Sequence, residues 1–155
     1  MESLEHQQVE KALTIALEAH RGQRDKYAAP YVLHPLRILS RFSDPTLQQI
    51  AILHDVIEDS PCTLDQLRKQ GFSEKVVQAV DALTRREDEP YDALIGRASE
   101  DALALKVKLA DLEDNMDIRR MHGITEKDRV RLDRYRKAHA RLLATRPQNH
   151  HTSAT

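Results

Sequence analysis

The 155-residue chain is 40% hydrophobic and 32% charged, and its 24 basic and 25 acidic residues nearly cancel. The length fits one domain, and the small net charge excludes the strong overall positive field that non-specific nucleic-acid binding exploits. Cys62 is the only cysteine, which excludes an internal disulfide and fits a reducing cytoplasm. The polar N-terminus is unlike a signal peptide, and no apolar run approaches the roughly 20 residues that span a bilayer. We therefore expect a cytoplasmic protein without a membrane partner.

Apolar residues that recur at three- and four-residue steps predict helices along most of the chain, and no segment has the alternation of a strand. The first helix places His20 on its inward face, and an aperiodic loop follows it. Pro35 near the start of the second pattern places His34 at a helix entrance. The helices are expected at about 3–22, 36–42, 45–54, 64–70, 74–83, 100–116 and 126–143, with a weak, short one at 91–97. This pattern predicts an all-α helical bundle with about seven helices around one core.

Capping residues set several of these boundaries. The expected N-caps are Asp44, Thr63, Ser73, Ser99 and Thr125. The helix after Asp44 begins at Pro45 and is expected to continue through His54. Residues 1–145 are expected to form one domain, and the aperiodic tail 146–155 is expected to be disordered. The charged first and last helices fit either solvated faces or an interface between copies.

The helix at 45–54 ends in a cluster of hydrophilic residues, His54, Asp55, Glu58 and Asp59, in the pattern HDxxED. Helical spacing places these four groups within about one turn, beside apolar residues. Desolvated carboxylates are costly unless a cation or donor compensates, and no lysine or arginine lies in that turn. A bound metal ion is the interpretation that explains the cluster.

One histidine and one aspartate cannot complete a coordination sphere, so further ligands must come from elsewhere in the chain. His34 is a candidate because it lies at a helix entrance, and Asp111 because it lies in an apolar stripe of the helix at 100–116. Imidazole and carboxylate together favour a first-row divalent metal such as Mn, Fe, Co or Zn. Two histidines and two aspartates leave coordination positions for water and a phosphate oxygen.

Simpler structural interpretations also exist. An inward histidine such as His20 is usually a hydrogen-bonded core residue. Glu58 fits a solvent-facing acid at a helix end, although the dipole there disfavours it. If Glu58 and Asp59 instead lie beside the metal without binding it, they can transfer protons, and their proximity raises the pKa of one of them. The sequence leaves open which of the two is the acid and which the base.

Four motifs occur in one order: AHRGQ at 19–23, PYVLHP at 30–35, LHDVIED at 53–59 and VKLADLEDN at 107–115. In order and approximate spacing, they resemble the hydrolase domain of Rel/SpoT-type enzymes and the stand-alone small alarmone hydrolases. The resemblance covers about residues 9–143. It implies a helical HD fold that holds one Mn²⁺ and removes pyrophosphate from the 3′ position of the alarmone (p)ppGpp, giving GDP or GTP.

Matched position by position, the resemblance also implies roles for individual residues. The implied metal ligands are His34, His54, Asp55 and Asp111, and the implied catalytic pair is Glu58 and Asp59. The implied substrate contacts are Lys26, Asn115, Tyr135 and Lys108. For Lys108 a solvated lysine is an equally open alternative.

The segment after AHRGQ departs from the family pattern. Members that cleave guanosine alarmones usually carry an arginine–lysine pair there, with the arginine packed on the base, whereas this chain has Asp25 before Lys26. A carboxylate repels phosphate and cannot stack on a base as a guanidinium does. Arg24 and Tyr27 are the candidate replacements, Tyr27 by stacking on the purine.

The leading hypothesis is a Mn-dependent nucleotide pyrophosphohydrolase that acts on an alarmone 3′-diphosphate and has no nucleic-acid partner. The nearest alternative is an HD-type phosphohydrolase for another nucleotide, either a nucleoside monophosphate or an adenosine alarmone. A non-catalytic nucleotide-binding module on the same scaffold is the alternative from a different functional class.

Overall fold

The computed structural model describes residues 3–145, and these residues are almost entirely helical. They form α1 (Leu4–Ala19), α2 (Leu33–Leu39), α3 (Pro45–Leu53), α4 (Val56–Asp59), α5 (Leu64–Lys69), α6 (Glu74–Leu83), α7 (Tyr91–Glu100), α8 (Ala102–Asn115), the 3-10 helix η1 (Ile118–Arg120) and α9 (Glu126–Thr145). Within this range the only β-type pairing is an isolated bridge between Arg24 and Pro30. The predicted all-α bundle is confirmed, while the tail at 146–155 lies outside the described residues.

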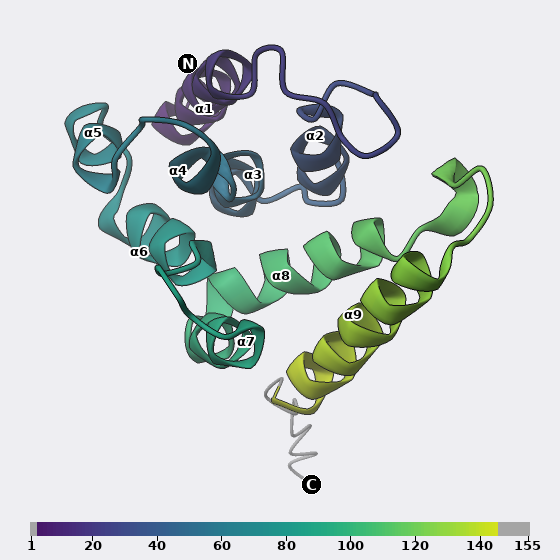
Figure 1. Cartoon of the computed structure of the whole chain (residues 1–155). Coiled ribbons are helices and arrows are strands. Elements are labelled where there is room, and N and C mark those ends of the chain that lie inside the picture. The colour runs from purple at the N-terminus through teal and green to yellow at the C-terminus, as the bar shows by residue number, and fades with distance from the viewer. Residues whose placement is uncertain (1–2, 146–155) are drawn as a thin grey trace, which may run out of the picture.

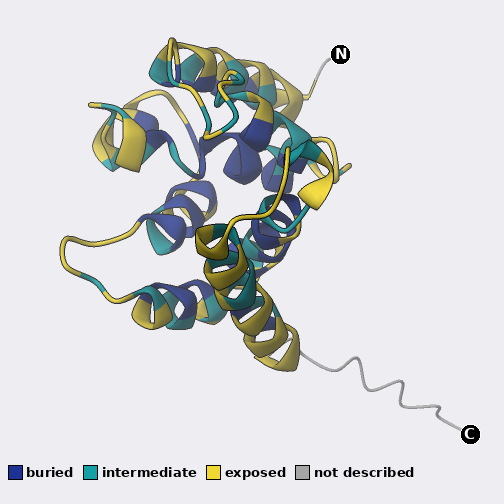
Figure 2. Cartoon of the chain, turned by 45° about the vertical axis from the view of Figure 1, so that its right-hand side comes forward, coloured by how far each residue is buried: buried dark blue, intermediate teal, exposed yellow. Residues whose placement is uncertain are grey.

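Helix α3 is the centre of the fold. It packs against α1, α2, α6 and α8 (Figure 1). Its last residues, 50–53, are all apolar and completely buried. Figure 2 shows the same arrangement, with buried segments gathered in the middle and the outer faces of α1 and α9 exposed. His54, the residue directly after α3, therefore lies in the interior.

Helix α8 is shared between two clusters of apolar side chains. Val107 and Ala110 pack into the main core, whereas Leu105, Leu109 and Leu112 pack into a smaller core against α7 and α9. Burial on both faces fixes α8 in place and brings its C-terminal half against α2 and α3.

The helix expected to continue through His54 ends one residue earlier, and a turn separates α3 from the four-residue α4. The imidazole Nδ1 of His54 donates to the carbonyl oxygen of Ala51 at 2.7 Å. It thereby occupies the carbonyl that the next amide of a continuing helix would use. Asp55 then adopts φ −107° and ψ 0°, in the sparsely populated bridge region that active-site residues often occupy. The His-Asp pair thus lies at a helix break.

The predicted cap at Ser99 is wrong. Ser99 lies inside α7, where its hydroxyl donates to the carbonyl of Gly96, and α8 begins only after Asp101. The Asp101 carboxylate accepts hydrogen bonds from the amides of Leu103 and Ala104 at 3.0 and 2.9 Å. A carboxylate that accepts two amide hydrogens at the positive end of a helix satisfies more donors than the serine hydroxyl does.

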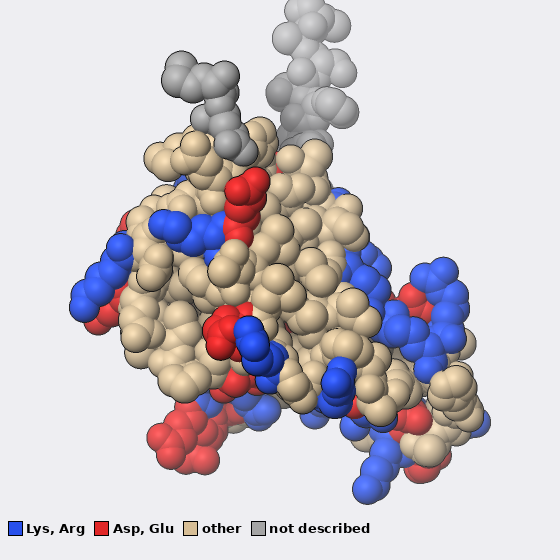
Figure 3. Space-filling model, turned by 90° about the horizontal axis from the view of Figure 1, so that it is seen from above, with Lys and Arg blue, Asp and Glu red and all other residues tan. Residues whose placement is uncertain are grey.

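Charge is dispersed on the face of the molecule seen from above. Figure 3 shows Lys and Arg side chains interspersed with Asp and Glu there, and much of that face carries neither. None of the helices in residues 3–145 has the length and apolar character needed to cross a membrane.

We predict that Asp101→Ala lowers the free energy of unfolding by about 1 kcal/mol, because two amide groups at the start of α8 lose their acceptor. Ser99→Ala should change it by less than about 0.5 kcal/mol, since that hydroxyl only adds to a carbonyl already within a helix. Urea unfolding followed by circular dichroism measures both. Equal destabilisation by the two substitutions would contradict this assignment of the cap.

Candidate metal centre and active site

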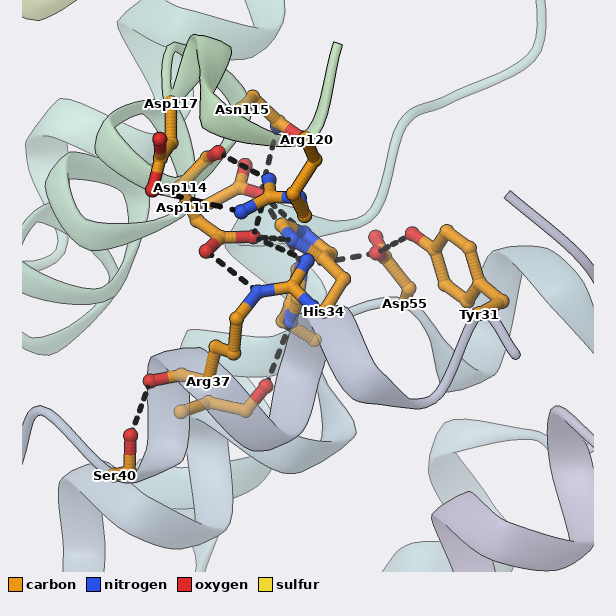
Figure 4. A network of polar contacts seen from close by, with 12 residues as sticks. Tyr31, His34, Arg37, Ser40, Asp55, Asp111, Asp114, Asn115, Asp117 and Arg120 are labelled. Carbon is orange, nitrogen blue, oxygen red and sulfur yellow. Dashed lines mark hydrogen bonds and ion pairs between the residues drawn. The ribbon is translucent and has the colours of Figure 1, made fainter. Parts of the chain in front are cut away.

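The candidate metal centre lies where α2, the turn after α3, and α8 meet (Figure 4). The ligand atoms of His34, His54 and Asp111 all lie within 4.8 Å of one another, and the three residues are buried. Asp111 Oδ1 lies 2.8 Å from His34 Nε2 and 3.6 Å from His54 Nε2. The Asp55 carboxylate also approaches His54 Nε2, at 2.9 Å. The fold therefore brings together four groups from three separate segments.

The two imidazoles are oriented as metal ligands would be. His54 donates through Nδ1 to a backbone carbonyl, so its Nε2 carries the lone pair, and this buried atom has no hydrogen-bond partner. His34 points its Nδ1 at Asp114 and its Nε2 at Asp111. Metal-binding histidines commonly use one ring nitrogen for the ion and the other for a carbonyl or carboxylate. The donor set therefore fits a first-row divalent ion.

The electrostatics of this cluster favour charged carboxylates. Burial raises the pKa of Asp55, but the neighbouring His54 outweighs it and lowers that pKa to about 2. Burial likewise raises the pKa of Asp111, yet Lys108 and the two imidazoles hold it well below its usual value. Burial lowers the pKa of His34 and of His54, and the carboxylates reverse this in both. A divalent cation would supply the positive charge that protonated imidazoles otherwise provide.

Lys108 is not the solvated lysine that the sequence left open. Its side chain is 13% exposed, and its Nζ lies 2.7 Å from Asp111 Oδ2. Asn115, one turn further along α8, donates to the other oxygen, Asp111 Oδ1, at 3.1 Å. Both residues therefore orient Asp111 in the structure.

Asp114 and Tyr31 belong to the site and were missed in the sequence. The buried Asp114 carboxylate accepts from His34 Nδ1 at 2.6 Å and from the Arg37 guanidinium at 2.8 and 3.0 Å, and Arg120 lies 3.5 Å away. The Tyr31 hydroxyl donates to Asp55. A signal for Asp114 was available, because it follows Asp111 by three residues and so shares a face of α8.

The acid pair Glu58–Asp59 lies at the end of α4, partly open to solvent. Glu58 accepts a hydrogen bond from the backbone amide of Arg85, and Asp59 accepts one from the Gln23 side chain at 3.1 Å. Partial burial is the largest cause of a raised pKa in both carboxyls, and the charge of Asp55 adds to it. Both acids are therefore better suited to proton transfer near neutral pH than ordinary carboxyls.

Arg85 and Arg86 lie in the loop between α6 and α7. The Arg85 guanidinium donates to the Glu89 carbonyl at 3.0 Å, and Arg86 pairs with Asp81 at 2.7 Å. Both guanidinium groups thus hold the loop between α6 and α7. That loop contributes the backbone amide that binds Glu58.

A cavity of about 370 Å³ opens beside the buried cluster, with Tyr31, His34 and Gln23 in its wall. Most of the substrate residues implied by the sequence line it, namely Arg24, Lys26, Tyr27, Asn115 and Tyr135. Lys108 does not. Five basic and two acidic residues line the cavity, so its charge suits an anion.

Asp25 has a structural role in the loop before α2. Its Oδ1 accepts from the amides of Tyr27 and Ala29 at 2.8 and 3.0 Å, which closes the loop tightly. Ala28 consequently adopts a left-handed φ of 65°. Because the carboxylate is occupied by backbone amides, it is directed into its own loop. Lys26 extends over the Tyr27 ring at 5.1 Å and lies 3.6 Å from Asp128.

Comparison with known proteins gives a consistent result. The chain is 35% identical over 117 residues to the guanosine-3′,5′-bis(diphosphate) 3′-pyrophosphohydrolase of Haemophilus influenzae. This match covers 66% of the chain and 17% of that protein. It is 31% identical over 122 residues to a GTP pyrophosphokinase of Streptomyces coelicolor, covering 70% of the chain and 14% of that protein. This chain is a relative of the Rel/SpoT-type HD proteins. It spans less than a fifth of the length of these curated relatives.

A solved structure agrees on the fold. A metazoan ortholog of SpoT, described as hydrolysing ppGpp and playing a role in starvation responses, superposes with a TM-score of 0.73 at 24% identity. The match covers 92% of this chain and 87% of the other. No protein-family model matches the chain. The HD-type helical bundle expected from the motifs is therefore confirmed.

We predict that Asp114→Asn weakens the binding of a divalent ion by about 10- to 100-fold, because His34 loses the charged group that orients its ring. Glu113→Gln is the matched control, since this neighbouring acid on α8 pairs with Arg41 at the surface and should leave the affinity unchanged. Competition with a fluorescent chelator measures both affinities. Equal affinity in wild type and Asp114→Asn would contradict an orienting role for Asp114.

Proposed function

We propose that this chain is a metal-dependent nucleotide pyrophosphohydrolase that holds Mn²⁺ and acts on a (p)ppGpp-like 3′-diphosphate. The products are GDP or GTP and pyrophosphate. The proposal rests on one observation above all: a buried set of imidazole and carboxylate ligands lies beside a pair of acids with raised pKa and a cation-lined cavity. The names of its relatives point to the same substrate.

In this proposal His34, His54, Asp55 and Asp111 bind the metal ion. The bound ion supplies positive charge that stabilises the negative charge developing on the phosphate oxygens. Lys108 and Asn115 hold the Asp111 carboxylate in place, and Tyr31 does the same for Asp55. These contacts restrict the ligands to one geometry before substrate arrives.

Glu58 and Asp59 transfer protons in the proposed reaction. Attack by water forms a new P–O bond at the phosphorus attached to O3′, and the P–O3′ bond breaks. One carboxylate accepts the proton that the water loses, and a proton returns to O3′ as the nucleotide leaves. The raised pKa of each acid brings its proton exchange closer to neutral pH than that of an ordinary carboxyl.

The nucleobase contacts in this proposal come from the cavity wall. Tyr27 and Tyr135 are available for stacking, and Arg24 and Lys26 for the phosphates. Asp25 is committed to its own loop, so no arginine packs on the base at that position. This difference favours a second candidate, hydrolysis of a related nucleotide such as an adenosine alarmone or a nucleoside monophosphate.

We predict that the full chain with Mn²⁺ releases pyrophosphate from ppGpp, and that Asp59→Asn reduces kcat at least about 100-fold because a proton-transfer group is lost. Asp65→Asn is the matched control, because this exposed acid on α5 pairs only with Arg68 in the described structure and should leave kcat unchanged. Enzymatic detection of pyrophosphate and of phosphate measures the products.

Three outcomes of this assay count against parts of the proposal. Phosphate in place of pyrophosphate would indicate a monophosphatase. Turnover of adenosine alarmones without turnover of ppGpp would change the substrate. Metal binding without turnover of any nucleotide, across several divalent metals, would leave a non-catalytic nucleotide-binding module.

A further inference from the structure

Asp59 belongs to a chain of side chains that reaches into the core. Gln23 Nε2 donates to Asp59 Oδ2 at 3.1 Å, and Gln23 Oε1 lies 2.8 Å from His20 Nδ1. The Asp59 side chain is 28% exposed, whereas the His20 side chain is 0% exposed. One amide therefore connects a surface acid to a completely buried imidazole.

The hydrogens in this chain can be assigned from its chemistry. An ionised carboxylate only accepts, so Gln23 must direct its NH₂ group at Asp59 and its carbonyl at His20. His20 must then donate through Nδ1. Its Nε2 is buried without a hydrogen-bond partner, as expected if the ring hydrogen is on the other nitrogen. The pattern of partners thus specifies one tautomer and one amide orientation.

Both supporting residues are held firmly. His20 caps α1, and its ring lies 5.0 Å from the Tyr31 ring. The backbone amide of Gln23 donates to the His20 carbonyl at 3.0 Å, and the Gln23 carbonyl accepts from the Tyr31 amide at 2.9 Å. The main chain of Gln23 is therefore anchored on both sides, and its amide group has little freedom to turn.

Asp59 itself is poorly restrained by its own element. It is the last residue of α4, a helix of four residues whose C-terminal end repels a negative charge. The only side-chain hydrogen bond that Asp59 makes in the described structure comes from Gln23. Without that bond, solvation would draw the carboxylate outward from the candidate metal centre.

We propose that His20 and Gln23 are positioning residues that hold the Asp59 carboxylate in its working orientation. The inference rests on the proposed function of Asp59 in proton transfer. The simpler interpretation of His20 as a hydrogen-bonded core residue explains its burial but gives no reason for the contact between Gln23 and the acid. A positioning role explains both the contact of Gln23 with Asp59 and the contact of His20 with Gln23. Such a role matters because a displacement of about 1 Å in a catalytic group can lower the rate about 100-fold.

The kinetic test compares three variants of the full chain with Mn²⁺ and ppGpp. Gln23→Met keeps the length but removes the amide, and should lower kcat about 10- to 100-fold with KM within about twofold. His20→Leu removes the donor and should lower kcat similarly. His20→Asn carries an NH₂ group near the position of Nδ1, and should retain most of kcat. Equal losses in His20→Asn and His20→Leu, or a change in KM alone for Gln23→Met, would overturn the proposal.

A second test requires no turnover and separates this proposal from the proposed function. Long-range ¹H–¹⁵N spectra of the histidine rings should show His20 protonated at Nδ1 in wild type. The Gln23 side-chain amide signals should shift in Asp59→Asn and stay unchanged in Asp65→Asn. Protonation of His20 at Nε2 alone, or unchanged Gln23 signals, would overturn the positioning role even in an active enzyme. The expected spectra in a protein without nucleotide turnover would contradict only the proposed function.

Discussion

The structure depends on compensation of the charge that is buried where α2, α3 and α8 meet. Asp111 is almost fully buried, and an isolated carboxylate there would be strongly unfavourable. Three neighbours compensate the negative charge of Asp111. They are Lys108 on the same helix, His34 on α2 and His54 directly after α3. Because these partners come from three different segments, Asp111 is compensated only when α2, α3 and α8 are packed together as they are in the bundle.

The rigid elements of the fold explain why this cluster has a defined geometry. Helix α3 is surrounded by four other helices, and α8 is buried on two faces. Ligands delivered by such elements stay in place more precisely than ligands on loops. The loops contribute in other ways. The segment after α1 forms one wall of the cavity, and the segment after α6 holds Glu58 through a backbone amide. Helices thus carry His34 and Asp111, and the turn directly after α3 carries His54 and Asp55, while loops hold the acid pair through hydrogen bonds and line the cavity.

The sequence predicted those site residues that are polar or charged but lie in or beside apolar helical segments. Asp111 was found because it is an acid in an apolar stripe, and His54 because it begins a hydrophilic cluster at the end of a mostly apolar helix. Gln23 was missed because its partner Asp59 lies 36 residues away, and no local pattern marks a contact across that separation. The helix break at His54 was missed for a related reason, since it depends on a side-chain bond to a carbonyl that helical periodicity does not reveal. Sequence alone also did not reveal that the Asp25 carboxylate accepts two amides of its own loop, and its predicted repulsion of phosphate stays a prediction.

The central claim is that the buried histidines and aspartates bind one divalent ion, and anomalous diffraction tests it most directly. Crystals of the full chain grown with Mn²⁺ should give a single strong anomalous peak between His34, His54, Asp55 and Asp111. The account predicts that this peak is lost in His54→Ala while the helical fold remains. A peak elsewhere, no peak, or an unchanged peak in His54→Ala would contradict the account.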